Sequence, residues 1–354
     1  MANPSAGLEN RVRDYRARRG WSQEGLARRA GLSRAGVSAI ETGRLVPSAA
    51  AALALAAAFG VRVEDIFSLP RPAPEGVSWA WEPAALPSRY WRAEVGGTTR
   101  LFPAEPTPLG VVPHDGVARG AGPVPSEPGG ADPGATLVMA CCDPAVGLLA
   151  DALARAAGVR LIALTRPSRA ALDLLGRGLV HAAGVHLARA GDGNDAAVRE
   201  AVGPGYVLLR VARWEEGVAF GPARRLRTVG EAVRSGLRWV GREVGSGARQ
   251  CLDELLGDRT PPRRQAHDHR GVAEAVRAGW ADAGVCLRLA GEEAGLGFLP
   301  VREEAYDLCF PESLADDPRL RALTDAVRSP VYRRLLGELP GYDSGETGEI
   351  RRVI

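Results

Sequence analysis

The sequence contains no lysine, few aromatic residues and no long hydrophobic run. All 45 basic residues are arginine, which, with the abundant alanine and glycine, we attribute to a coding bias. No apolar run approaches the ~20 residues that a membrane span needs, and the N-terminus has no signal-peptide pattern. The five cysteines form neither a CxxC pair nor a disulfide-like framework. These absences predict a soluble, reduced, cytoplasmic protein.

Catalytic signatures are also missing. No Ser/His/Asp set, metal-ligand cluster or Walker-type loop is recognisable, so the sequence predicts neither a catalytic residue nor a metal site. The length of 354 residues predicts two or three domains, and the 45% hydrophobic content is high enough for each to have a hydrophobic core. The net charge of +3 is too small for a protein that coats polyanions without specificity. Residues 1–68, however, hold ten arginines and six acidic residues, a net charge of +4 that suits a DNA-facing module.

Residues 21–48 predict two short helices joined by a tight turn. Gly31 supplies the left-handed residue that ends the first helix, and Ser33 caps the second. Val37 and Ile40 form one apolar face of that second helix. Its free face carries small and basic residues, which a DNA major groove can accept. This is the layout of a helix-turn-helix.

The flanking segments predict three more short helices, so residues 8–68 form a compact all-α bundle. It resembles the Cro/repressor-type (Xre), lambda-repressor-like helix-turn-helix family. The matching residues are Ser22, Gln23, Glu24, Leu26, Ala27, Ala30, Gly31, Ser33, Ser38, Ile40, Glu41, Gly43, Pro47, Ser48 and Val63 to Phe67. The alternative is a helical bundle used only for protein contacts.

The resemblance implies a double-stranded DNA operator as partner. The DNA-contacting residues it implies are Gln23, Ser33, Arg34, Ala35, Ser38, Ala39, Thr42 and Arg44. Gln23 would hold a phosphate, and Thr42 and Arg44 would approach the backbone. Arg34 is the best base reader, because its guanidinium can bridge guanine O6 and N7. A single helix-turn-helix has little contact area, so we expect a homodimer on a near-palindrome.

The segment after the bundle, residues 70–116, predicts a small β element. Residues 89–95 and 98–102 alternate like strands around Gly96 and Gly97, which is a hairpin signal. Residues 77–81 alternate in the same way. Residues 117–134 are rich in proline and glycine and predict a flexible linker.

Residues 135–340 alternate strand and helix, which predicts parallel sheets wrapped by helices. The length is about twice one mononucleotide-binding unit, so we expect two α/β lobes. The expected strands are 136–142, 159–164, 179–187, 206–212, 237–242, 281–287, 297–300 and 306–310, and the expected helices are 144–157, 168–177, 246–256, 272–278, 318–328 and 330–339. The polar tail, residues 341–354, is expected to be loose.

This α/β region resembles the type II periplasmic-binding-protein-like domains that are fused to bacterial regulators and to molybdopterin-biosynthesis proteins. The matching pieces are residues 142–145, 182–187, 245–249, 273–285 and 304–308. Ala248 stands where the family usually has threonine, which removes one hydroxyl donor. The resemblance implies molybdate, tungstate or a molybdenum-cofactor-related compound as a small anionic effector, with no cofactor required.

The loops of this region favour anion binding on physical grounds. Ligands of such sheets lie where helices begin, and helix N-termini offer free N–H groups and partial positive charge. The candidate ligand-binding residues are Cys142, Asp143, Ser168, Gly245, Ser246, Gly247, Arg249 and His269. They begin four helices, whose N-termini we expect to meet in one cleft.

Each candidate has a purely structural alternative. Ser168 is by default an ordinary helix cap, and Arg249 could pair with Asp253 instead of a ligand. His267 and His269 lie in a polar loop and are more often solvated than metal-bound. His186 is more often a core histidine than part of a cleft lining, and Cys141–Cys142 is more often a pair of small strand-end residues than a redox switch.

The sequence therefore predicts a ligand-responsive DNA-binding transcriptional regulator and not an enzyme. Two other functions stay open. One is an enzyme of molybdenum-cofactor metabolism with a DNA-binding tail. The other is a constitutive DNA-binding protein whose α/β domain only mediates assembly.

Overall fold

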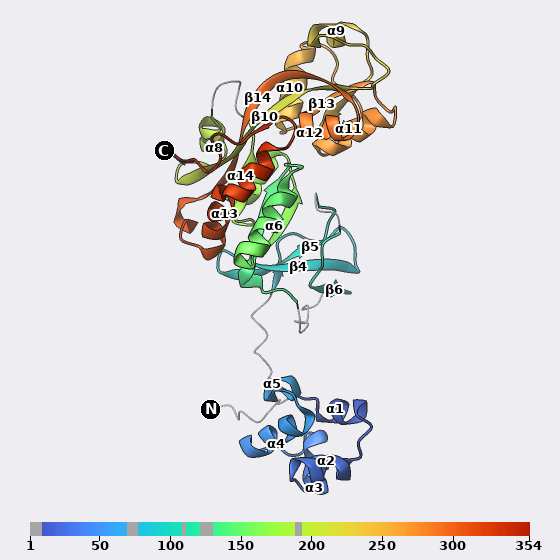
Figure 1. Ribbon diagram of the computed structural model, residues 1–354, viewed down its shortest axis with the longest axis vertical. Coiled ribbons are helices and arrows are strands. Elements are labelled where there is room, and N and C mark those ends of the chain that lie inside the picture. The colour runs from blue at the N-terminus through green and yellow to red at the C-terminus, as the bar shows by residue number, and fades with distance from the viewer. Residues whose placement is uncertain (1–8, 69–76, 108–110, 121–129, 188–192) are drawn as a thin grey trace. The chain divides into compact units, whose positions relative to one another are not determined.

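The structure, a computed structural model, describes residues 9–68, 77–107, 111–120, 130–187 and 193–354. The chain divides into two units, residues 1–76 and 77–354 (Figure 1). Across the described residues, no helix is both long and apolar enough to cross a bilayer.

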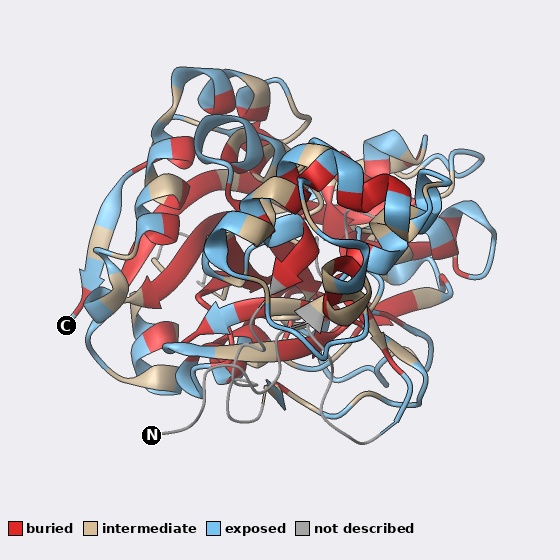
Figure 2. Ribbon diagram, turned by 90° about the horizontal axis from the view of Figure 1, so that it is seen from below, coloured by how far each residue is buried: buried red, intermediate tan, exposed pale blue. Residues whose placement is uncertain are grey.

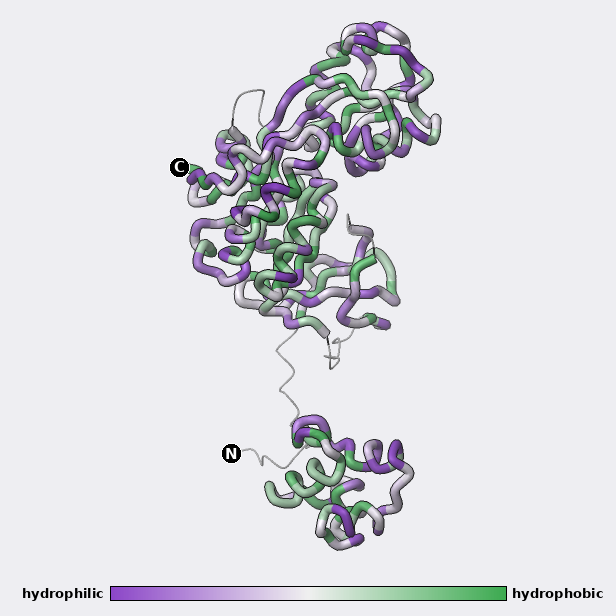
Figure 3. Tube along the Cα trace, in the orientation of Figure 1, coloured by the Kyte–Doolittle hydropathy of each residue, from purple (hydrophilic) through white to green (hydrophobic). Residues whose placement is uncertain are grey.

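The first unit is the expected five-helix bundle. Its helices are α1 (Val12–Arg18), α2 (Gln23–Ala30), α3 (Arg34–Glu41), α4 (Ala49–Phe59) and α5 (Val63–Ile66). Two short strands, β1 (Glu9–Asn10) and β2 (Phe67–Ser68), pair antiparallel and join its ends. Helix α4 is hydrophobic in nearly all of its residues (Figure 3).

Local signals explain where these helices begin and end. The side chains of Ser22, Ser33 and Ser48 each accept a backbone N–H from the first turn of α2, α3 and α4. Gly31 ends α2 with a φ of 64°, a left-handed conformation that glycine adopts without strain. The predicted cap residues are therefore confirmed.

The second unit contains a small four-stranded sheet. Its strands are β3 (Ser78–Trp79), β4 (Ser88–Val95), β5 (Thr98–Pro103) and β6 (Gly116–Ala118), in the order β3-β5-β4-β6. Strands β4 and β5 form the predicted hairpin around Gly96 and Gly97, both with positive φ. Half of the predicted linker, residues 121–129, lies outside the described residues. At its two ends the prediction was wrong, because residues 117–118 belong to β6 and residues 133–134 to a short 3-10 helix.

This small sheet packs directly on the α/β core. Trp91 and Phe102 are buried in one cluster with core residues of the α/β region. The Asp115 carboxylate accepts from the Arg160 guanidinium at 2.7 Å. The carbonyl oxygen of Glu94 lies 2.9 Å from His181 Nε2 and accepts from Arg319 Nη1 at 2.6 Å. The sheet is therefore part of the second unit.

The remainder of the second unit has two lobes on one ten-stranded sheet. The first lobe contains η1 (Pro133–Ala135), β7 (Thr136–Cys141), α6 (Val146–Ala157), β8 (Arg160–Thr165), α7 (Ser168–Gly176), β9 (Ala182–Val185), α8 (Asp195–Val202), η2 (Glu312–Leu314), α13 (Pro318–Arg328) and α14 (Pro330–Gly337). The second lobe contains α9 (Val229–Arg234), β11 (Trp239–Arg242), α10 (Gly247–Leu256), β12 (Gln265–Ala266), α11 (His269–Arg277), β13 (Ala283–Leu287) and α12 (Arg288–Glu293).

Two long strands, β10 (Tyr206–Phe220) and β14 (Gly297–Pro311), run through both lobes and connect them (Figure 1). The strands of the shared sheet are mostly buried, whereas the helices expose one face (Figure 2). The multidomain fold class, a helical bundle followed by a two-lobed α/β domain, is confirmed.

Three details of the expected fold were wrong. The sheet is mixed instead of parallel, because β10 pairs antiparallel with both β13 and β14. Residues 297–300 and 306–310 belong to one continuous strand. The tail is ordered, because β15 (Tyr342–Asp343) and β16 (Ile350–Val353) both pair with β10. A buried Thr347 hydroxyl, which donates to Val211 O at 2.6 Å, fixes the segment between them.

Candidate functional site

Four helix starts converge where the two lobes meet. The residues just before α6, together with α7, come from the first lobe, and α10 and α11 come from the second. The Arg169 backbone N–H of α7 donates to the Gly245 carbonyl at 3.3 Å. Gly247 lies so close to His186 that an added Cβ would be 2.5 Å from His186 Nδ1. We call this buried region the interlobe centre.

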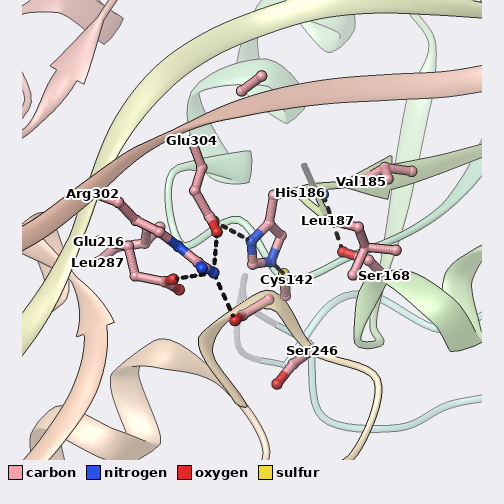
Figure 4. Close-up of polar contacts among 12 residues, drawn as sticks. Cys142, Ser168, Val185, His186, Leu187, Glu216, Ser246, Leu287, Arg302 and Glu304 are labelled. Carbon is pink, nitrogen blue, oxygen red and sulfur yellow. Dashed lines mark hydrogen bonds and ion pairs between the residues drawn. The ribbon is translucent and has the colours of Figure 1, made fainter. Parts of the chain in front are cut away.

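A cysteine, a histidine and a glutamate form a continuous array in the interlobe centre (Figure 4). Cys142 Sγ lies 3.0 Å from His186 Nε2, and His186 Nδ1 lies 2.8 Å from Glu304 Oε2. Burial acts to lower the pKa of His186, but Cys142 and Glu304 together raise it well above its usual value. These two neighbours therefore stabilise a proton on the imidazole.

Arg302 extends the array toward the second lobe. Its guanidinium lies 2.5 Å from Glu304 Oε1 and 3.1 Å from Glu216 Oε2. Burial and the charge of Glu304 raise the pKa of Glu216, whereas hydrogen bonding to His186 helps to lower the pKa of Glu304. The carboxylate nearer to His186 thus holds the negative charge.

His269 faces this array with an unused hydrogen-bond donor. Its Nδ1 accepts the Leu287 backbone N–H at 3.3 Å. Burial, Arg242 and His186 lower the pKa of His269 well below its usual value, so the ring is neutral and its proton is on Nε2. Among the described residues, nothing accepts from that buried N–H.

This tautomer decides what the interlobe centre can hold. The ligand atoms of Cys142, His186 and His269 lie within 4.8 Å of one another, a spacing that a metal ion could bridge. A metal-bound histidine uses one nitrogen for the metal and donates from the other. His269 does the reverse, because its Nδ1 accepts and its Nε2 carries the proton. The arrangement therefore fits an anion better than a metal.

Arg242 provides a second unused donor. It ends strand β11 and is fully buried. Its Nε and Nη2 each lie 2.8 Å from the Glu243 carboxylate, and Nη1 has no hydrogen-bond partner among the described residues. Its positive charge helps to lower the pKa of His269, and Cys142 helps to raise the pKa of Arg242.

Asp143 lies at the start of the loop into α6 and is also buried. Its Oδ1 accepts from the Ala145 backbone N–H at 2.9 Å and from the Tyr342 hydroxyl at 2.7 Å. Burial raises the pKa of Asp143 to about 6. The carboxyl group therefore makes its hydrogen bonds within the first lobe. Its hydrogen bond with Tyr342 connects the ordered tail to this site.

The other predicted ligand residues lie around this centre. Ser168 is buried, and its Oγ accepts from the His186 backbone N–H at 3.2 Å. Ser246 caps α10 by accepting the Arg249 backbone N–H at 3.2 Å. The Arg249 guanidinium is paired with Asp253 at 2.8 Å, which is the alternative that the sequence left open.

A surface hollow of about 460 Å³ opens between the lobes beside this centre. Gly245, Ser246 and Arg249 line it from the second lobe, and Arg169 and Leu187 line it from the first. One expectation was wrong here, because His269 is completely buried and not solvated. His186 is completely buried, as expected of a core histidine, and it takes part in a polar array.

The second candidate site is the outer face of α3 in the first unit. Val37 and Ile40 are buried as expected. Arg34 and Ala35 are exposed, and Ser38 and Ala39 are partly exposed. The Ser33 hydroxyl accepts from the Gly36 N–H at 3.0 Å, so its oxygen serves as the helix cap.

The remaining predicted DNA-contacting residues make contacts within the unit. Gln23 Nε2 donates to Glu41 Oε2 at 2.9 Å, which leaves one amide proton for a phosphate. Arg44 Nε donates to the Thr42 hydroxyl at 2.9 Å, and that hydroxyl donates to the Ser38 carbonyl at 2.8 Å. Thr42 and Arg44 are both exposed just beyond α3.

Comparison with known proteins agrees with this division. The helix-turn-helix domain family matches residues 10–66, and the PBP superfamily domain matches residues 150–328, about half of the chain. An uncharacterized HTH-type transcriptional regulator of Bacillus subtilis, YgzD, is 45% identical over 62 residues, which cover 18% of this chain and 94% of YgzD. The chain belongs to the PBP superfamily and to the HTH-type transcriptional regulators.

Other relatives of this regulator match one part of it. The uncharacterized protein YvgK of Bacillus subtilis is 29% identical over 157 residues, 42% of this chain, and the chain spans half the length of YvgK. MJ0272 of Methanocaldococcus jannaschii, an uncharacterized HTH-type transcriptional regulator, is 43% identical over 60 residues, which cover 17% of this chain and 91% of MJ0272.

Two solved structures resemble the regulator more distantly. PhnD1 of Prochlorococcus marinus in complex with methylphosphonate is 11% identical, with 60% of this chain and 93% of PhnD1 covered and a TM-score of 0.44. A putative phosphate transporter substrate-binding protein of Clostridium perfringens with bound phosphate is 11% identical, with 57% and 97% covered and a TM-score of 0.47. Likeness at this level carries no information about the ligand of this regulator.

Sequence reasoning left five residues of the interlobe centre out of the predicted site, namely His186, Glu216, Arg242, Arg302 and Glu304. Arg242 and His186 each lie at the carboxyl end of a strand, and a polar residue at that position was a usable signal. Glu304 lies within β14, 118 residues from its partner His186, and nothing in its local pattern marks it.

Proposed function

We propose that this regulator binds operator DNA through α3 and that a small oxyanion bound in the interlobe centre changes its DNA affinity. The observation that carries the proposal is the pair of buried, unused donors, Arg242 Nη1 and His269 Nε2. A buried N–H without a partner is costly, so these two donors favour a ligand that accepts hydrogen bonds.

The surroundings of these donors favour negative charge on the ligand. Four helix starts converge there, and each contributes free N–H groups and partial positive charge. The nearby acidic groups are already compensated, since Glu304 contacts His186 and Arg302. Molybdate and tungstate are the candidates implied by the sequence resemblance, and phosphate and sulfate are tetrahedral anions of the same class.

Strands β10 and β14 provide the element by which binding could be transmitted. Their pairing is irregular between Arg210 and Ala212 and again between Glu216 and Gly217, where the strands pass from one lobe to the other. Such irregularities bend strands and can absorb a change of angle. We propose that an anion held by both lobes favours the closed arrangement over an open one.

We further propose that the regulator is a homodimer. Helices α6, α13 and α14 border an apolar groove of about 630 Å³, at whose edge Val331 is 60% exposed. Asp151, Arg155, Arg321 and Asp325 line the same groove, and such a mixture of charges can complement itself across a two-fold axis. Val331→Asp should shift sedimentation toward the monomer, whereas Val244→Asp, at another exposed valine, should not.

Calorimetric titration of the full chain with molybdate, tungstate, phosphate and sulfate tests the ligand proposal. At least one anion should bind, and His269→Phe should weaken it by about tenfold or more, because one hydrogen bond to an anion contributes roughly 1.5–3 kcal/mol. Arg277→Ala is the control, since Arg277 is exposed, is paired with Glu274 and does not line the hollow. No heat with any of the four anions would contradict the proposal and favour a domain that only mediates assembly.

A further inference from the structure

The array of Cys142, His186 and Glu304 has the geometry of an activated thiol. His186 Nε2 is 3.0 Å from the sulfur, within reach to accept its proton, and Glu304 fixes the ring from the opposite side at 2.8 Å. A base that is itself oriented by a third group is the arrangement that activates nucleophiles. An anion-binding site does not require it, because an oxyanion needs donors and not a proton acceptor beside a thiol.

The other four cysteines of the chain lack this arrangement. Cys141, Cys251, Cys286 and Cys309 are buried, and burial raises the pKa of each thiol. Among the described residues, Cys142 alone has a histidine ring nitrogen at hydrogen-bonding distance from its sulfur. The five thiols in one molecule therefore provide an internal comparison.

A second observation points to what the thiol would attack. The Nε2–H of His269 is fully buried and has no acceptor among the described residues. A ring nitrogen of His269 lies within 4.8 Å of both Cys142 Sγ and a ring nitrogen of His186. Arg242 contributes a positive charge that interacts with Cys142. When a nucleophile attacks, negative charge develops on the leaving group of the attacked molecule. Hydrogen-bond donors close to the nucleophile can stabilise that charge.

We propose that Cys142 is a nucleophile that is oxidised by a small hydroperoxide, with His186 as its base and Glu304 as the residue that positions His186. Cys142 is only 3% exposed, which favours a compact reactant over a bulky electrophile. The product, a sulfenic acid, remains in a centre rich in hydrogen-bond donors. This would give the regulator a second, covalent input that is separate from anion binding.

The reaction balances without any further reactant. His186 Nε2 takes the thiol proton, and the thiolate attacks one peroxide oxygen. A sulfur–oxygen bond forms as the oxygen–oxygen bond breaks, so that sulfur loses two electrons and the peroxide gains them. The departing oxygen, held by the donors of His269 and Arg242, takes the proton from His186 and leaves as an alcohol, or as water when the reactant is hydrogen peroxide.

The test uses the full chain, hydrogen peroxide and a sulfenic-acid-specific label, with each cysteine followed by mass spectrometry. Cys142 should be labelled about 100-fold faster than any of the other four, the scale of rate that a positioned base supplies. Labelling of Cys142 at the same rate as Cys141 or Cys309 would overturn the proposal. This comparison within one molecule needs no variant.

Glu304→Gln then separates a positioning role from a structural one. The groups that surround His186 are Cys142, Asp143, Glu216, Arg242, His269, Arg302 and Glu304. The Gln variant keeps the shape but lowers the charge beside His186, so Cys142 labelling should slow by about tenfold and its pH midpoint should shift. Glu303→Gln, at the exposed neighbouring position, should leave both unchanged. An unaltered pH profile in Glu304→Gln would contradict the role of Glu304.

The oxidation is measured without any effector. Failure of Cys142 labelling therefore leaves the anion-binding proposal standing, and absence of anion binding leaves the labelling result interpretable.

Discussion

The helix-turn-helix unit and the interlobe centre place their polar side chains in opposite ways. In the first unit, Arg34 and Arg44 are exposed at or just beyond one helix, close together in sequence. In the interlobe centre, Cys142, His186 and Glu304 are buried and come from three distant segments. Exposed residues can be exchanged at little cost to the fold, whereas buried charges are tied to one another.

Each unit also has one buried carboxylate that shows the difference. Burial acts to raise the pKa of Glu41, but hydrogen bonds from Arg16 and Gln23 lower it overall. Asp143 has no guanidinium partner, and burial raises its pKa to about 6. The charged form of Glu41 is therefore favoured, and that of Asp143 is disfavoured.

The largest expected effect comes from Glu304→Ala. It leaves the nearly buried Arg302 with only part of its counter-charge, and breaking such a buried pair costs about 3–5 kcal/mol. The melting temperature of the second unit, residues 77–354, should fall strongly, whereas the melting temperature of the first unit should not change. Glu303→Ala, on the exposed face of the same strand, should have little effect on either unit. Equal melting temperatures of the second unit in the Glu304→Ala and Glu303→Ala variants would contradict the proposed difference between buried and exposed charges.

Asp143→Asn should remove the pH dependence of stability that Asp143 contributes. The folded-state pKa of Asp143 is raised from 3.8 to about 6, so its contribution to stability is present below about pH 4 and is lost as pH rises through 6. Asparagine remains neutral and should stabilise the second unit at pH 7 by up to about 3 kcal/mol. Denaturant unfolding at pH 4 and pH 7 measures this difference. Asp173→Asn, at an exposed carboxylate, is the matched control, and an identical response of both variants would contradict the assignment.

Gly247→Ala should disturb lobe closure without changing the first unit. The added methyl would approach His186 Nδ1 and the His186 carbonyl oxygen to 2.5 Å. Overpacking of this kind costs about 1–3 kcal/mol. Anion affinity in calorimetric titration should fall by about 5- to 150-fold, and binding to random DNA should remain the same. Gly221→Ala, where nothing lies within 4 Å of the added Cβ, should bind the anion normally.

Substitutions of Arg34 on α3 and of Arg44 just beyond it should have the smallest effect on stability and act on DNA binding alone. Arg34→Ala should cost about 1–3 kcal/mol on a selected operator and relax specificity at one base pair. Arg44→Ala should weaken operator and random DNA alike and reduce the slope of the salt dependence by about one. Fluorescence anisotropy on both DNAs distinguishes the two, and equal losses for Arg34→Ala on both would disprove its reading of a base.

The same contrast explains how much could be predicted from the sequence. Ser22, Ser33 and Gly31 act through neighbours a few residues away, so the helix boundaries of the first unit were readable. The hairpin at Gly96 and Gly97 is equally local. The four helix starts of the α/β region were found for the same reason.

The contents of the interlobe centre depend on long-range pairing and could not be predicted. Strand β14 brings Glu304 to His186, and the tail brings Tyr342 to Asp143 across 199 residues. Neither contact has a local pattern. The buried tautomer of His269 depends on the Leu287 backbone, which only the folded chain places beside it.

The most direct test of the account measures the coupling between the two units in both directions. An operator is first selected from random DNA, and its affinity for the full chain is measured with and without the anion that gives the strongest calorimetric signal. Anion affinity is then measured with and without operator. We expect the two ratios to be equal and to lie between about 5 and 150, because binding linkage is reciprocal. A ratio of one in both directions would contradict a regulator that responds to this ligand.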